Sequence, residues 1–387
     1  MRDSKRHESV TVLPVATKRP AARPLRIAQV APLYESVPPK LYGGTERVVA
    51  NLSEELAARG HKVTLFASGD STARVPVCAA WPSSLRLAGL NRFGDAYQLL
   101  NLTAAYGRAD EFDIIHTHVD YLAFPFARLT ATPSVATMHG RLDWPPIDPI
   151  YRSFSDVALV SISRSQRAQL PQLNWVGTVH HGLPPDLLSF SPGPGRYLAF
   201  LGRISPEKRP DLAIEVARLT GIPLKIAAKV DPADRDYFER VIRPLLRSPD
   251  IEFIGEINER EKNQFLGEAL ALLFPIDWPE PFGLTMIEAL ACGTPVIARP
   301  CGSVPEVIRD GVSGFVATTT EELAAAVRRV ETISRQACRR EFETRFTAAH
   351  MADGYEAIYR LFCADEELFD RSASRAKPAN LNALQSA

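Results

Sequence analysis

Residues 280–288 read Glu-Pro-Phe-Gly-Leu-Thr-Met-Ile-Glu, and this stretch is the strongest indication of the fold. A short apolar run at residues 271–275 precedes it, and a helical pattern of apolar residues continues from it to about Cys292. An apolar run, a loop with proline and glycine, and an amphipathic segment are typical of a strand that turns into a helix. The stretch therefore predicts one strand–loop–helix unit of an α/β domain.

Two glutamates bound this stretch, eight residues apart. On one helix they would lie about 12 Å apart along the axis, at ~1.5 Å per residue. The paired carboxyls of a glycosidase lie ~5–9.5 Å apart, so the spacing disfavours a direct acid–nucleophile pair. We expect Glu280 in the loop and Glu288 two turns into the helix, where it can accept hydrogen bonds from a sugar diol. Free backbone N–H groups at the helix N-terminus suit a phosphate, and they would come from Phe282, Gly283 and Leu284. A surface helix with two solvated acids is the alternative.

Apolar runs and helical patterns alternate on both sides of a Pro/Gly-rich joint at residues 189–196. Before the joint, strands are expected at residues 26–32, 61–68, 112–118, 134–139, 157–163 and 178–182. After the joint, they are expected at residues 197–203, 223–230, 251–255, 271–275 and 294–298. Helices are expected from Thr45 and at residues 210–220 and 284–292. This alternation predicts mostly parallel sheets with helices on both faces. The predicted fold class is α/β, with two Rossmann-like doubly wound domains, at residues 25–190 and 191–345, that face a central cleft.

The composition excludes several classes of protein. The chain has 387 residues, with 45 Lys and Arg against 45 Asp and Glu, so its net charge is zero. A nucleic-acid-binding protein usually carries a positive surplus, and this chain has none. Its longest apolar stretch, residues 269–276, is far shorter than the ~20 residues of a membrane span. Five scattered cysteines without CxxC spacing argue against a disulfide scaffold or a zinc site, and favour a reducing compartment. We therefore expect a cytoplasmic protein.

The two ends of the chain differ from the body. Residues 1–24 are polar and without periodicity, and they carry six Lys or Arg and two acids, a surplus of +4 that leaves −4 for the remaining residues. We expect a disordered basic extension there and a second disordered tail at residues 372–387. The extension permits at most a transient contact with an anionic membrane surface, such as the inner face of the membrane.

Two further segments are placed where α/β sheets bind ligands. Arg203 and Lys208 directly follow a predicted strand, and the carboxyl ends of parallel strands face the ligand crevice. Arg offers a fork for two phosphate oxygens and Lys a point charge, which together suit a diphosphate, whereas a solvated basic turn is the alternative. Gly43 and Gly44 separate the first strand from its helix, so the backbone there can approach a ligand closely. A plain turn explains these glycines equally well.

Histidines also end several predicted strands. His139 ends one strand, and His116 and His118 share one face of another because side chains alternate along a strand. A metal pair and two half-buried core histidines are the alternatives for His116 and His118, and no acidic or cysteine partner spacing favours the metal. The pair at residues 180–181 suggests a hinge or the cleft wall. The Asp-Arg-Asp at residues 234–236 is of the kind that holds a metal diphosphate, although a solvated helical face is favoured.

Taken in order, these motifs resemble retaining glycosyltransferases of family 4, including their EX7E pattern at Glu280 and Glu288. The resemblance extends from about residue 26 to about residue 362 and implies the GT-B fold, with an acceptor-side N-terminal domain and a nucleotide-sugar-binding C-terminal domain. It implies that a last helix, at residues 346–365, crosses back to the N-terminal domain. It places Gly43 and Gly44 beside the donor phosphates and assigns the diphosphate to Arg203 and Lys208.

The same resemblance assigns the remaining roles. It implies that Glu280 holds sugar hydroxyls, Glu288 holds the ribose and His139 contacts the sugar near the reacting carbon, so Glu280 and His139 are the expected catalytic residues. Where the family often has an acid after this histidine, the chain has Gly140. The resemblance also implies that the acceptor attacks from the front face with retention, and that the leaving phosphate accepts the acceptor's proton. It further implies that the reaction needs no metal or other cofactor.

The expected function is transfer of a hexose from a nucleotide-diphosphate sugar to an unidentified hydroxyl acceptor (a sugar, a glycolipid or a small molecule) in glycan or glycoconjugate synthesis. UDP-glucose is the expected donor and GDP-mannose the alternative. A nucleotide-sugar epimerase on the same architecture and a catalytically silent sugar-binding protein are competing functions. An NAD-dependent oxidoreductase is disfavoured because the only approximate glycine fingerprint, at residues 193–195, precedes a strand instead of following one.

Overall fold

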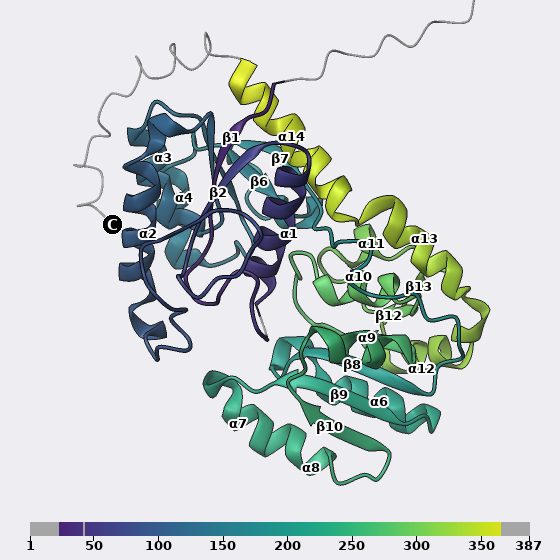
Figure 1. Cartoon of the computed structure of the whole chain (residues 1–387). Coiled ribbons are helices and arrows are strands. Elements are labelled where there is room, and N and C mark those ends of the chain that lie inside the picture. Colours follow the sequence, from purple (N-terminus) through teal and green to yellow (C-terminus); the bar gives the residue numbers. More distant parts are fainter. Residues whose placement is uncertain (1–22, 42, 365–387) are drawn as a thin grey trace, which may run out of the picture.

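The computed structural model describes residues 23–41 and 43–364. Two parallel sheets form two lobes, and the last helix extends from the C-terminal lobe along the N-terminal one (Figure 1). This arrangement confirms the predicted class of two doubly wound α/β domains. The tails expected at residues 1–24 and 372–387 lie outside the described residues, apart from Arg23 and Pro24.

The N-terminal sheet has seven strands in the order β3-β2-β1-β4-β5-β6-β7. Alternate side chains of its central strand β1 enter two different cores, with Ile27 in one and Ala28 in the other, so helices cover both faces. The strands are β1 (Arg26–Val30), β2 (Lys62–Ala67), β3 (Val77–Ala79), β4 (Ile114–Thr117), β5 (Ser134–Thr137), β6 (Leu159–Ser161) and β7 (Trp175–Thr178). The helices are α1 (Gly44–Ala58), α2 (Gly94–Tyr106), α3 (Phe124–Leu129), α4 (Asp148–Ser153) and α5 (Arg164–Arg167).

One predicted strand of this lobe is wrong. The strand expected at residues 178–182 lies earlier, at Trp175–Thr178, where it pairs with β6. The following residues leave the sheet because His181 turns into the space between the lobes, where it lines a cavity. The sheet takes up Trp175–Thr178, a segment that begins with the apolar pair Trp175-Val176.

The C-terminal sheet has six strands in the order β10-β9-β8-β11-β12-β13. The strands are β8 (Tyr197–Arg203), β9 (Leu224–Lys229), β10 (Ile251–Gly255), β11 (Ala269–Phe274), β12 (Val296–Ala298) and β13 (Gly314–Val316). Its helices are α6 (Pro210–Thr220), α7 (Arg235–Tyr237), α8 (Arg243–Leu245), α9 (Glu259–Gly267), α10 (Leu284–Ala291), α11 (Val304–Val307), α12 (Thr320–Arg328) and α13 (Arg335–Arg345), and the last helix, α14 (Ala348–Ala364), follows them in the chain. Strand β8 and helix α6 have the predicted bounds.

Both sheets reverse their strand order at an inner strand. In the N-terminal sheet the reversal lies between β1 and β4, and in the C-terminal sheet between β8 and β11. A ligand crevice forms at such a switch point, outside the carboxyl ends of the strands. The loops that leave β1, β4 and β11 carry Gly43, His118 and Glu280, and Arg203 is the last residue of β8. The topology therefore directs the predicted motifs of both lobes toward the space between them.

The chain crosses between the lobes twice, and the two crossings are bonded to each other. The backbone N–H of Leu183 donates to the carbonyl of Phe346 at 2.9 Å, and the N–H of Ala348 donates to the carbonyl of Leu183 at 2.8 Å. A Cβ atom on Gly182 would lie 2.2 Å from the carbonyl oxygen of Thr347, so this close approach requires glycine. The pair of crossings forms the hinge side of the cleft.

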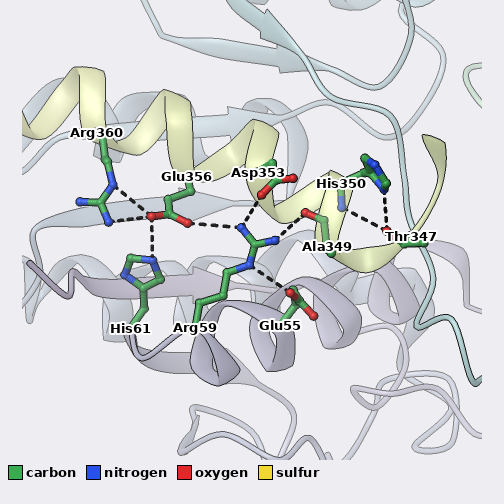
Figure 2. A network of polar contacts seen from close by, with 9 residues as sticks. All are labelled: Glu55, Arg59, His61, Thr347, Ala349, His350, Asp353, Glu356 and Arg360. Atoms are coloured by element: carbon green, nitrogen blue, oxygen red, sulfur yellow. Dashed lines mark hydrogen bonds and ion pairs between the residues drawn. The ribbon is translucent and has the colours of Figure 1, made fainter. Parts of the chain in front are cut away.

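Helix α14 is held on the N-terminal lobe by a charged network around Arg59 (Figure 2). The Arg59 guanidinium donates to Asp353 at 2.7 Å and to the carbonyl oxygen of Ala349 at 2.7 Å, and it also contacts Glu55 and Glu356. On the inner side of the helix, Tyr355 is fully buried in the core of the N-terminal sheet. Helix α14 is therefore an integral part of the N-terminal lobe, although it follows the C-terminal lobe in sequence.

Replacing Arg59 with alanine tests this attachment. Arg59→Ala leaves several carboxylate and carbonyl partners without a donor, and we expect a loss of ~1–3 kcal/mol in unfolding free energy, measured by urea denaturation. The matched control is Arg152→Ala, because Arg152 pairs with Asp148 on the same lobe but its side chain is 72% exposed. That variant should lose at most ~0.5 kcal/mol. Equal losses in the two variants would contradict a special role for Arg59.

Candidate active site

A cavity of about 490 Å³ lies between the lobes, at the two switch points. This volume is typical of a site for a small ligand. Residues of both lobes line the cavity, and all ten predicted site residues are among them: Gly43, Gly44, His139, Arg203, Lys208, Glu280, Phe282, Gly283, Leu284 and Glu288. The structure therefore brings together all ten predicted site residues in one cavity, and their individual roles stay predictions.

The N-terminus of α10 opens into this cavity. Gly283 precedes the helix with φ +79°, and a Cβ atom there would lie 2.8 Å from Met286 Cε, so the turn requires glycine. No described side chain caps this helix, and its first turn holds no acid. Its first N–H groups, together with the positive end of the helix dipole, can therefore receive an anion. Gly44 faces them from the other lobe, and a Cβ atom on it would lie 3.4 Å from Leu284 Cδ1.

Both predicted cations contact carboxylates in the cavity wall. Arg203 pairs with Glu207 and lies 3.5 Å from Asp234. Lys208 pairs with Glu280 and lies 5.0 Å from the centre of the Trp278 ring. A diphosphate must therefore share these cations with carboxylates, or replace the carboxylates.

The Asp-Arg-Asp segment differs in part from its prediction. It is helical, as expected, and the Asp236 side chain is 87% exposed. The Asp234 side chain is only 17% exposed, because it turns toward Arg203. The solvated face expected for the whole segment is therefore wrong for Asp234.

Glu288 is held through one oxygen only. Lys262 Nζ donates to Glu288 Oε1 at 2.6 Å, while Glu288 Oε2 is buried and has no hydrogen-bond partner among the described residues. That oxygen remains an acceptor for a hydroxyl pair in the cavity. Lys262 is not among the predicted site residues, although the sequence carries a signal for its helix. Asn258 and Glu261 form a capping box that begins α9, one turn before Lys262.

His139 is a neutral hydrogen-bonding group in this cavity. It follows β5, and its ring stacks on His181 with centroids 5.2 Å apart. Burial lowers the pKa of His139 to about 3, so the imidazole carries no charge near neutral pH. Its Nε2 lies 2.8 Å from His118 Nδ1. His139 is therefore suited to orienting a hydroxyl and not to stabilising an anion as a cation.

Two polar contacts join the lobes on different sides of the cavity. Arg47 of α1 pairs with Glu259 of α9. Glu306 of α11 accepts hydrogen bonds from the backbone N–H groups of Arg164 at 2.9 Å and Ser165 at 2.7 Å, both at the start of α5. Since each pair joins an N-terminal to a C-terminal element, these contacts set the separation of the two cavity walls.

The described residues contain neither a metal-binding cluster nor a membrane-spanning helix. Within residues 23–41 and 43–364, no three His, Cys, Asp or Glu side chains gather in a way that would hold a metal ion. In the same part of the chain, no helix combines the length and the apolar character needed to cross a membrane.

Comparison with known families matches both lobes. The family described as "Glycosyltransferase Family 4" matches residues 42–176, and "Glycosyl transferases group 1" matches residues 189–345. The chain belongs to glycosyltransferase family 4. Membership confirms that the protein is a transferase enzyme and that the two lobes form a GT-B fold.

Several curated family members are similar over most of their length. D-inositol 3-phosphate glycosyltransferase of Mycolicibacterium vanbaalenii is 28% identical, over 84% of this chain and 86% of its own. The enzyme of the same name from Mycolicibacterium smegmatis is also 28% identical, over 84% of this chain and 87% of its own.

Solved structures share the fold at lower identity. AviGT4, a glycosyltransferase involved in avilamycin A biosynthesis, superposes with a TM-score of 0.70 at 23% identity, over 88% of this chain and 99% of its own. Anabaena HepE, solved in complex with UDP and glucose, gives a TM-score of 0.67 at 16% identity, over 87% of this chain and 100% of its own.

The contact of Glu306 between the lobes predicts a pH-dependent stability. Burial raises the pKa of Glu306, but hydrogen bonds from His180 and from the backbone of Arg164 and Ser165 outweigh burial and lower the pKa to about 2. A carboxyl with a lowered pKa stabilises the fold above about pH 4.5 and loses this effect as the pH falls toward 2. Between pH 7 and pH 3, the thermal midpoint should therefore fall further in the wild-type protein than in Glu306→Gln. The exposed Glu331→Gln serves as control and should follow the wild type; parallel curves for all three would refute the prediction.

Proposed function

We propose that the protein transfers a hexose from a nucleoside diphosphate sugar to a hydroxyl acceptor, with retention of anomeric configuration and without a metal ion, in glycan or glycoconjugate synthesis. One observation carries this proposal. A single cavity combines an uncapped helix N-terminus, a cation at the end of β8 (Arg203), a second cation in the turn that follows it (Lys208), and a carboxylate with one unpartnered oxygen (Glu288). These are the groups that would receive a diphosphate, its charge and a ribose.

The proposed donor lies across the C-terminal wall. The diphosphate would lie between the N-terminus of α10 and the cations Arg203 and Lys208. The open oxygen of Glu288 would accept the ribose hydroxyls, and Glu280 would accept sugar hydroxyls, since its carboxylate is already oriented by Trp278 Nε1 at 2.9 Å. UDP-glucose is the first donor to test because HepE, which shares the fold, was solved with UDP and glucose. GDP-mannose is the second.

The proposed reaction is a front-face substitution at the anomeric carbon. The bond from this carbon to the diphosphate oxygen breaks, the acceptor oxygen bonds to the same face, and the acceptor proton passes to the leaving phosphate. Negative charge grows on the leaving group, where Arg203, Lys208 and the helix N-terminus would stabilise it. Enclosure of the sugar between the lobes would reduce its hydrolysis by water. The curated relatives make inositol 3-phosphate one acceptor to include among sugars and small alcohols.

Mass spectrometry tests the proposal directly. Each donor is incubated with each acceptor, and the expected product is the acceptor plus one hexose, its anomeric configuration read by NMR. A reaction without acceptor provides the contrasting outcome. Isomerised donor in that reaction, with no transfer to any acceptor, would identify an epimerase and overturn the proposal.

Arg203→Ala tests the diphosphate contact. Loss of a charged hydrogen-bond donor should weaken UDP binding by ~1.5–3 kcal/mol, or about 10- to 150-fold in Kd, measured by calorimetry. Arg240→Ala is the control, because Arg240 lies in the same lobe with its side chain 81% exposed. Unchanged affinity for UDP in Arg203→Ala would reject the diphosphate site.

Metal independence has its own test. Because cations of the chain and a helix N-terminus can balance the leaving-group charge, the transfer rate should be unchanged by excess EDTA. The control is the same assay after addition of Mg²⁺ or Mn²⁺, which should add no more than a small salt effect. A complete loss in EDTA that Mn²⁺ restores would overturn this part of the mechanism.

A further inference from the structure

A line of buried polar side chains connects the last helix to His139. Gln29 lies in the middle of β1, with its amide Nε2 3.0 Å from the Tyr359 hydroxyl of α14. Its Oε1 lies 2.8 Å from His118 Nε2, and His118 Nδ1 lies 2.8 Å from His139 Nε2. Tyr359, Gln29 and His118 are at most 2% exposed. None of these three residues has a part in the proposed mechanism, so the line requires another explanation.

The line has a direction because an amide oxygen can only accept. Gln29 Oε1 therefore accepts a hydrogen bond from His118 Nε2–H. A neutral imidazole has a single N–H, so His118 Nδ1 carries a lone pair and accepts from His139 Nε2–H. Burial lowers the pKa of His118 well below its usual value, which keeps the ring neutral as this scheme requires. His139 is thereby fixed as the Nε2–H tautomer.

The contacts at the far end of the line are compatible with this placement of the Gln29 amide. The Tyr359 hydroxyl accepts from Gln29 Nε2–H and therefore directs its own proton to His116 Nδ1, at 2.6 Å. The other nitrogen of His116 then donates to Thr137 Oγ1 at 2.7 Å. In this arrangement, each hydrogen bond of the line joins one donor to one acceptor. A reversed amide would require each of these bonds to reverse.

The backbone of His139 is held independently of its ring. Asp120 lies in the left-handed region with φ +50°, which is unusual for a residue other than glycine. Burial raises the pKa of Asp120, and a hydrogen bond from the backbone of His139 lowers it, with a net value of about 6. The turn at Asp120 thus directs its carboxyl toward the backbone of His139, the residue whose ring contacts His118. Strain of this kind is typical of functional sites.

One atom of His139 remains without a partner. Its Nδ1 is buried and makes no hydrogen bond to any described residue. In the Nε2–H tautomer, this atom is an acceptor in a ring that lines the cavity. It therefore suits a group that donates a proton, such as a sugar hydroxyl, and not another acceptor such as a phosphate oxygen.

We propose that helix α14 sets the tautomer of His139 through Tyr359, Gln29 and His118, and so keeps His139 Nδ1 as an acceptor for a hydroxyl of the donor hexose. The identity of that ligand rests on the proposed function, whereas the tautomer does not. The three residues are positioning residues, since they act on the substrate only through His139. The helix that holds the N-terminal lobe together thereby also determines the hydrogen-bonding polarity of the cavity.

NMR of the full-length protein with ¹⁵N-labelled histidine tests the tautomer without any substrate. The His139 resonances are assigned by their loss in His139→Ala, and we expect protonated Nε2 and unprotonated Nδ1 at pH 7. Tyr359→Phe removes the hydroxyl that orients Gln29 and should give a mixture of tautomers. Tyr355→Phe is the matched control, because its hydroxyl is equally buried on the same helix but contacts Thr137, at 3.0 Å. It should retain the wild-type tautomer.

Transfer kinetics provide the second measurement. Tyr359→Phe should lower kcat about tenfold, the effect of one misaligned hydrogen bond, with the Kd for UDP unchanged. Tyr355→Phe should stay within about twofold of the wild type. A substitution pair at His118 covers the case in which Tyr359→Phe does not fold. His118→Asn keeps an oxygen acceptor near the position of Nδ1 and should retain most of the activity that His118→Phe loses.

Two results would overturn the proposal: a wild-type His139 protonated on Nδ1, or equal tautomer populations in Tyr359→Phe and Tyr355→Phe. Absence of transfer with every donor, together with the expected tautomers, would instead reject the proposed function alone. The NMR and kinetic measurements therefore separate failure of this inference from failure of the transferase proposal.

Discussion

The packing of helix α14 against the N-terminal sheet is the contact on which the rest of the structure depends. The helix begins directly after the second crossing between the lobes, so its packing on the N-terminal core determines where that crossing lies. The crossings in turn determine which edges of the two sheets face each other. Only with the carboxyl ends of both switch points turned inward do the loops after β1, β5, β8 and β11 enclose one cavity. Burial of Tyr355 and Tyr359 contributes much to this packing, because large aromatic side chains remove the most apolar surface from water.

Charge in the cavity is compensated locally. A chain with equal numbers of acids and bases could leave a basic pocket within an acidic body, yet the described cations of the cavity wall have carboxylate partners. Such pairs contribute little net stability when desolvation is counted, but they hold long side chains in one orientation. In the proposed reaction, phosphate and hydroxyl groups would take the place of carboxylates or join them. The cations would then need little reorganisation as charge develops on the leaving group.

Sequence periodicity was sufficient for the central strands and for the edge strand β10, and insufficient for the edge strands β3 and β13. Strand β8 forms a seven-residue run with four buried positions at its start, whereas β3 and β13 have three residues each and offer no period to detect. The site residues were predictable because the ends of parallel strands face the crevice wherever the strands lie. Lys262 and Gln29 were not, since their importance comes from partners that are distant in sequence, and such pairings depend on the tertiary fold. A polar Gln29 beside the apolar residues of β1 was a local sign of a buried network, as were the histidines at the strand ends.

That buried network also bears on why the N-terminal core is not simply apolar. Each unpartnered polar group in a core costs ~1–3 kcal/mol, so a line of histidines, tyrosines and a glutamine persists only if every bond is made. Apolar residues of similar volume would pack there at no such risk, which means that stability alone does not explain the network. Orientation does explain it, because the Gln29 amide, with Nε2 toward Tyr359 and Oε1 toward His118, allows one set of proton positions along the line. The set ends at His139, the point where the core of the N-terminal lobe meets the cavity. The interior of one lobe and the chemistry between the two lobes are therefore determined by the same hydrogen bonds.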